Sequence, residues 1–128
     1  MILYVGGRGQ GKLALALREQ GLDPAQVWDG AVCHLGEFPP KPVLNHLHRL
    51  IRRLMQAGID PAGYVEMLAA RCPELVVICD EVGCGVVPIE ASERQWREAV
   101  GRACCALAAK SQRVVRVVAG LPQTLKEI

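Results

Sequence analysis

A short apolar run, a glycine-rich loop and a helix-forming segment open the chain and limit the folds that it can adopt. Met1 to Val5 predicts a strand, and Leu13 to Gln20 carries apolar residues at helical spacing before Gly21. Between them, Gly6 to Lys12 reads G-G-R-G-Q-G-K and fits the phosphate-binding pattern G-x-x-x-x-G-K. A strand, a loop and a helix in this order are the context in which that pattern holds phosphates, so we expect a nucleotide site here.

The positions of this loop have separate expected roles. Glycines let backbone N–H groups turn inward around phosphates, Lys12 neutralises their charge, and Arg8 is a further candidate for phosphate contact. The pattern is incomplete, because Leu13 stands where Ser or Thr normally supplies a hydroxyl to Mg²⁺, and no Ser or Thr precedes Ser92. The alternative is a glycine-rich turn without a ligand. The expected nucleotide-binding residues are Gly6, Gly7, Arg8, Gly9, Gln10, Gly11 and Lys12, with Lys12 as the catalytic candidate.

Composition favours an α/β fold. Hydrophobic residues make up 51% of the chain and aromatic residues only 4%, so Leu, Val, Ile and Ala must build the core, as in sheets whose parallel strands are covered on both faces. A length of 128 residues predicts a single domain over 1–128. The net charge of +2 is too small to indicate a nucleic-acid partner, and no apolar run approaches the roughly 20 residues of a membrane span. We expect a soluble, cytoplasmic protein.

Hydrophobic patterning and helix breakers predict the remaining elements. Further strands are expected around Gln26 to Cys33, at Leu75 to Cys79 and at Val114 to Val118. Helices are expected from Val43 to Ala57, from Ala62 to Ala70 and from Glu90 to Lys110, and the residues after Gly120 are expected to form a short tail.

Three carboxylates are candidates for holding Mg²⁺. Asp80 and Glu81 follow the most apolar strand candidate, and a parallel strand delivers such side chains to the sheet edge where ligands bind. Asp29, at the end of the earlier strand candidate, is a competing ligand. The alternative for Asp80 or Glu81 is a role in capping the next turn. The sequence does not rank the three.

Histidines, arginines and cysteines give weaker signals. His46 and His48 are two residues apart on an expected helix, so we expect them to point about 200° apart, to lie on the surface and not to share one ligand. His34 is expected to be a bystander in a loop. The cluster Arg49, Arg52 and Arg53 is expected to form a solvated helix face, with an anion or partner contact as the alternative. The six cysteines have no zinc-site spacing and are expected to be reduced.

One long segment resembles a known family. Val76 to Pro88 reads V-V-I-C-D-E-V-G-C-G-V-V-P, similar to the N-E-V-G-x-G-I-V-P signature of the bifunctional adenosylcobinamide kinase/adenosylcobinamide-phosphate guanylyltransferases. Arg94 to Arg102 resembles their R-x-F-R-D-x-x-G-R segment, and Val117 to Pro122 with Lys126 extends the similarity. The resemblance implies a RecA-like P-loop domain, commonly a homotrimer, that uses GTP or ATP with Mg²⁺ to phosphorylate the corrinoid adenosylcobinamide and then attaches GMP to it.

Departures from the family pattern change this expectation. The family carries GMP on a histidine between its first helix and an acid-ended second strand, whereas no histidine lies between Lys12 and Asp29 here. Asp80 stands for the family's Asn, and Leu13 for its hydroxyl residue. We therefore expect residual kinase activity at most and no covalent GMP adduct. The alternative is a non-catalytic nucleotide-binding subunit or regulator that kept the fold.

Overall fold

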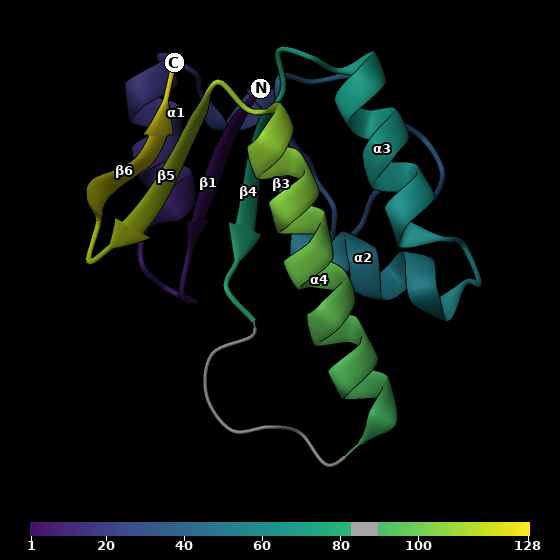
Figure 1. Cartoon of the computed structure of the whole chain (residues 1–128). Coiled ribbons are helices and arrows are strands. Elements are labelled where there is room, and N and C mark those ends of the chain that lie inside the picture. The colour runs from purple at the N-terminus through teal and green to yellow at the C-terminus, as the bar shows by residue number, and fades with distance from the viewer. Residues whose placement is uncertain (83–89) are drawn as a thin grey trace.

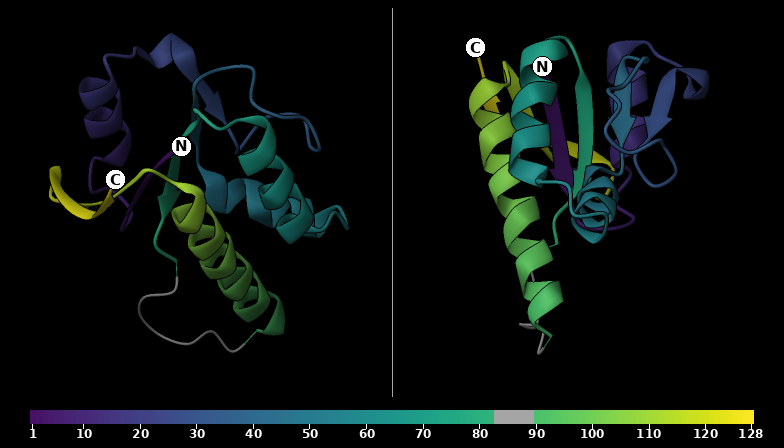
Figure 2. Two further views of the ribbon diagram at one scale, coloured as in Figure 1. Left: turned by 45° about the horizontal axis from the view of Figure 1, so that its top comes forward. Right: turned by 90° about the vertical axis from the view of Figure 1, so that its right-hand side faces the viewer.

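The computed structural model describes residues 1–82 and 90–128. These residues form a six-stranded sheet with helices on both faces (Figures 1 and 2). The expected α/β class with a mostly parallel sheet is confirmed. The strands are β1 (Ile2–Gly6), β2 (Val27–Asp29), β3 (Val43–Asn45), β4 (Val76–Asp80), β5 (Arg113–Val118) and β6 (Leu121–Glu127). The helices are α1 (Lys12–Gln20), α2 (Leu47–Gln56), α3 (Pro61–Arg71) and α4 (Ala91–Lys110), with a short 3₁₀ turn at Pro24–Gln26.

The strand order is β2-β3-β4-β1-β5-β6, and only β6 runs antiparallel to its neighbour. β1 lies between β4 and β5, with Gly6 opposite Asp80. The carboxyl ends of β1, β3 and β4 therefore meet at one edge of the sheet, where open α/β sheets bind their ligands. This edge receives the glycine-rich loop from β1, the start of α2 from β3 and the acidic pair from β4.

The core has one layer on each face of the sheet. On one face, α1 packs Leu15 and Ala16 against side chains such as Tyr4 and Ile78. On the other face, α2, α3 and α4 contribute leucines and alanines that pack with Leu3 and Val77. Figure 2 shows this division, with α3 and α4 on one side of the sheet and α1 on the other. Because both faces are covered, the central strands are apolar throughout rather than alternating.

Two of the expected elements are wrong. The helix expected from Val43 begins only at Leu47, because Val43 to Asn45 form β3 between β2 and β4. The tail expected after Gly120 is instead β6, which pairs antiparallel with β5. The other expected strands and helices are confirmed with end positions shifted by a few residues.

Part of the family-like segment lies outside the described residues. Its strand and acidic pair, 76–81, are described, whereas its glycine and proline positions, 83–88, are not. Within the described ranges, no helix is long and apolar enough to cross a membrane.

Candidate functional site

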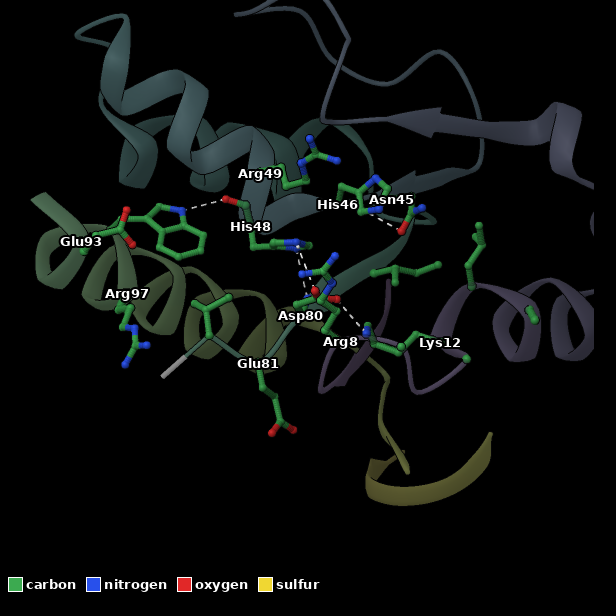
Figure 3. A pocket seen from close by; sticks show the side chains of 17 residues that line it. Arg8, Lys12, Asn45, His46, His48, Arg49, Asp80, Glu81, Glu93 and Arg97 are labelled. Atoms are coloured by element: carbon green, nitrogen blue, oxygen red, sulfur yellow. Dashed lines mark hydrogen bonds and ion pairs between the residues drawn. The ribbon is translucent and has the colours of Figure 1, made fainter. Parts of the chain in front are cut away.

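A cavity of about 980 Å³ opens at the carboxyl edge of the parallel strands (Figure 3). Its walls come from the glycine-rich loop, from the junction of β3 and α2, from the end of β4 and from the first turns of α4. Four segments that are distant in sequence therefore supply one site. The expected loop residues Arg8, Gly9, Gly11 and Lys12 are among those that line it.

The glycine-rich loop has the backbone conformation that its glycines allow. Gly9 and Gly11 have φ angles of +73° and +85°, a left-handed region that glycine adopts without strain. Gly11 is the N-cap of α1 and provides no side chain for the first helical N–H groups, so an anion can accept from them. On its outer side the loop is tied to the β5–β6 turn, because Gln10 accepts hydrogen bonds from the backbone N–H groups of Ala119 and Gly120.

Lys12 turns back into the site and is almost fully buried, at 7% exposure. Its Nζ donates to the carbonyl of Gly7 at 2.8 Å. It also forms an ion pair with Oδ1 of Asp80 at 2.7 Å (Figure 3). A buried ammonium needs such partners, since leaving it unpaired would cost several kcal/mol. The lysine is thus held at the cavity wall by groups that phosphate oxygens could replace.

His48 lies beside the other oxygen of the same carboxylate and accepts the backbone N–H of the same residue. Its Nδ1 accepts the backbone N–H of Asp80 at 3.2 Å, so the proton lies on Nε2, which is 3.3 Å from Oδ2 of Asp80. Burial lowers the pKa of His48 to about 4, against the opposing attraction of Asp80, and the nearby Lys12 adds to the lowering. His48 is therefore neutral at pH 7, and it is held in place as the acceptor of the backbone N–H of Asp80.

His46 lies outside the helix and beside the cavity. It has a left-handed φ of 60° as the N-cap of α2, and its backbone N–H donates to Oδ1 of Asn45 at 2.9 Å. Its Nδ1 is 2.8 Å from Oδ1 of Asp29. The rings of His46 and His48 are 5.8 Å apart and both line the cavity, so the expectation that they diverge on the surface is wrong.

The three candidate metal ligands are not brought together. Asp80 lies beside Lys12, whereas the side chain of Glu81 points away from it (Figure 3). Glu81 pairs with Arg116 at 2.9 Å. Asp29 is bound to His46; burial raises its pKa, but this bond and the N–H of Ala31 lower the pKa overall. Among the residues that the structure describes, no group of three or more His, Cys, Asp or Glu could hold a metal ion. Of the three, Asp80 is the one that pairs with the lysine of the glycine-rich loop.

Two arginines of the expected solvated cluster have structural partners. Arg52 pairs with Glu93 of α4 and covers the ring of Trp96 at 3.9 Å from its centroid. Arg53 donates to the carbonyls of Gly30 and Cys33 in the loop after β2. Arg49, in contrast, is exposed and lines the cavity.

Sequence reasoning missed the contributions of Asn45, His46 and His48 to this site. The missed signal is the apolar pair Val43 and Leu44 followed by Asn45, which is the pattern of a short buried strand that ends in a polar residue. An assignment of β3 would have brought these side chains to the same sheet edge as Asp80.

The comparison with known families concerns every wall of this site except the glycine-rich loop. Residues 44–125, more than half of the chain, match the family model described as cobinamide kinase / cobinamide phosphate guanyltransferase. A search among curated proteins gave no match. The match includes His46, His48 and Asp80, whereas the phosphate-binding pattern at 6–12 and Asp29 precede it.

Proposed function

Because the chain belongs to the cobinamide kinase / cobinamide phosphate guanyltransferase family, we propose that it transfers a phosphoryl group from GTP or ATP to a corrinoid hydroxyl in cobalamin biosynthesis. The observation that carries this proposal is the position of Lys12. Its ammonium group lies at the wall of a large cavity, between the phosphate-binding loop and a carboxylate at the end of β4.

Nucleotide binding in this site is an exchange of partners. Phosphate oxygens would accept from the first N–H groups of α1 and would replace Asp80 as the partner of Lys12. The released carboxylate of Asp80, still beside His48, would then face the phosphates.

Metal support at this site would depend on a single carboxylate. Mg²⁺ in nucleotide sites is commonly held by one or two carboxylates together with phosphate oxygens and water, a donor set that Asp80 can complete despite Leu13. When bound, Mg²⁺ would offset the charge of the β- and γ-phosphates.

The test of kinase activity is incubation with labelled GTP or ATP, Mg²⁺ and adenosylcobinamide. Phosphorylated product that is lost in Lys12→Ala supports the proposal. Nucleotide binding without product supports the alternative of a non-catalytic nucleotide-binding subunit or regulator. If millimolar nucleotide does not bind, both functions are refuted and Gly6 to Lys12 is only a turn.

A second candidate function is guanylyl transfer through His46, which the position of this residue favours. The bond between Nδ1 and Asp29 leaves the lone pair of Nε2, in the uncharged ring, free to act as a nucleophile. Attack on the α-phosphorus of GTP would form a P–N bond and release pyrophosphate. The sequence predicts no such adduct, because the family position for the histidine is missing.

The adduct test uses denatured protein recovered after incubation with GTP. Acid-labile GMP that is lost in His46→Gln and kept in the matched variant His34→Gln would support guanylyl transfer and overturn the expectation from the sequence. Protein without GMP would restrict the function to phosphoryl transfer.

We also propose, from the family, that the chain is a single domain that assembles as a homotrimer and acts in the cytoplasm without a nucleic-acid partner. Light scattering coupled to size-exclusion chromatography measures the assembly directly. A monomeric mass at micromolar concentration would contradict the trimer.

A further inference from the structure

We propose that Trp96 is the stacking platform for a planar conjugated ring of a substrate, on the α4 wall of the cavity. The inference rests on the proposed function, because that function supplies ligands that carry such rings. Two sources share this chemistry: the purine base of the nucleotide and the adenine of an adenosyl group on the acceptor.

The ring of Trp96 is held in one orientation. Its Nε1 donates to the backbone carbonyl of His48 at 2.8 Å, which ties α4 to the first turn of α2. The guanidinium of Arg52 lies 3.9 Å from the ring centroid and is itself fixed by two hydrogen bonds to Glu93. Because the ring is already held in this way, stacking of a ligand on it costs little additional side-chain entropy.

Part of the remaining surface of this ring lines the cavity, and part packs against the core. Arg52 covers one face and does not line the cavity, whereas the half-buried Trp96 does. Val82 and Ile78 add apolar surface, in contrast to the charged wall formed by Arg8 and Lys12. The cavity thus offers cations where phosphates would lie and an aromatic face where a ring would lie.

The platform is connected to the phosphate site by a short chain of contacts. Trp96 binds the carbonyl of His48, the imidazole of His48 binds Asp80, and Asp80 binds Lys12. The aromatic face and the phosphate-binding lysine are therefore held in a fixed relation within one cavity. A ligand with both a ring and phosphates, or two ligands that meet at Asp80, would use both.

The test compares Trp96→Leu with Trp96→Phe in the full-length protein by titration calorimetry. Phe loses Nε1 but keeps an aromatic face, so the pair separates stacking from the hydrogen bond to His48. The ligands are GTP, inorganic tripolyphosphate, which has no ring, and adenosylcobinamide. Trp28→Phe, outside the cavity on β2, is the control for a general effect of losing a tryptophan.

Stacking of a base on an aromatic side chain contributes about 1–3 kcal/mol, so Trp96→Leu should weaken the ring-bearing ligand by roughly 5- to 150-fold. Trp96→Phe should stay within about threefold of the wild type, and tripolyphosphate should bind equally to all variants. If Trp96→Leu binds GTP more weakly, the ring that stacks on Trp96 belongs to the nucleotide. If it binds adenosylcobinamide more weakly, the ring belongs to the acceptor.

Two results would overturn the inference and leave the proposed function intact. In one, Trp96→Leu binds GTP and adenosylcobinamide as the wild type does. In the other, Trp96→Leu weakens tripolyphosphate as much as the ring ligands, so that Trp96 only supports the cavity wall. A wild-type protein that binds neither GTP nor adenosylcobinamide would refute both proposals.

Discussion

Acidification below pH 6.5 should destabilise the protein through His48. Burial beside Lys12 lowers the pKa of this histidine from 6.5 to about 4 in the folded protein. Between these values the unfolded chain binds a proton that the folded protein excludes. The free energy of unfolding must therefore fall as the pH falls from 6.5 toward 4. Above this range, the contribution of His48 should not vary with pH.

The magnitude follows from the difference between the two pKa values. One pKa unit corresponds to about 1.4 kcal/mol, so the full effect of His48 is about 3 kcal/mol below about pH 4. At about pH 5 the loss relative to pH 7.5 is about 2 kcal/mol. This is a large fraction of the roughly 5–15 kcal/mol that stabilises a typical domain.

The assay is urea denaturation of the wild type and of His48→Asn at several pH values from 4 to 7.5. Asn can still accept the backbone N–H of Asp80 but does not titrate. The difference in the free energy of unfolding between the two proteins removes the contribution of the carboxylates, whose stabilising effects are lost at lower pH. If this difference stays constant across the range, His48 is not a buried neutral imidazole, and its assignment as the acceptor of the backbone N–H of Asp80 is wrong.

Three further substitutions, two of them with a matched control, test the site and the start of α2. Asp80→Asn should raise nucleotide affinity about 3- to 10-fold without Mg²⁺, because a negative charge beside the phosphates is lost. The same substitution should reduce the gain in nucleotide affinity that Mg²⁺ gives. Glu81→Gln is the matched control and should change neither affinity when binding is measured by calorimetry. Leu13→Ser should strengthen Mg²⁺-dependent nucleotide affinity and cost about 1–2 kcal/mol of stability, and unchanged affinity would contradict a vestigial phosphate site. Gly30→Ala should destabilise by about 1–3 kcal/mol in urea, because its Cβ would lie 2.9 Å from atoms at the start of α2. Gly101→Ala, in open space on α4, should instead stabilise by up to about 1 kcal/mol, and equal effects of the two glycine substitutions would refute the steric argument.

Sequence reasoning succeeded where one local pattern had one physical meaning. The continuous apolar run that became β4 can only be buried on both faces, and the strand before the glycine-rich loop has the same character. It failed at Val43 and Leu44, because these residues continue the apolar spacing of α2 and fit a helical stripe as well as a strand. Only the sheet order, with β3 between β2 and β4, decides between the two.

The same ambiguity explains the errors in the site. A helix that starts at Val43 places His46 and His48 on different faces, whereas the observed start at Leu47 leaves His46 in a left-handed turn outside the helix. β6 was missed because nearly all of its residues are exposed and Pro122 lies within it, so it carries no alternation toward a core. Its partner is the edge of β5, which local sequence does not reveal.

The junction between β3 and α2 is one residue long. A single left-handed residue, His46, separates the last strand residue from the first helical one. Adding or deleting one residue here would rotate α2 by about 100° relative to the sheet. That rotation would take His48 from Asp80 and Arg52 from Trp96 together. Homologous chains that keep this site should therefore vary in length elsewhere, as in the loop between β2 and β3, and keep the spacing from β3 to α2 fixed.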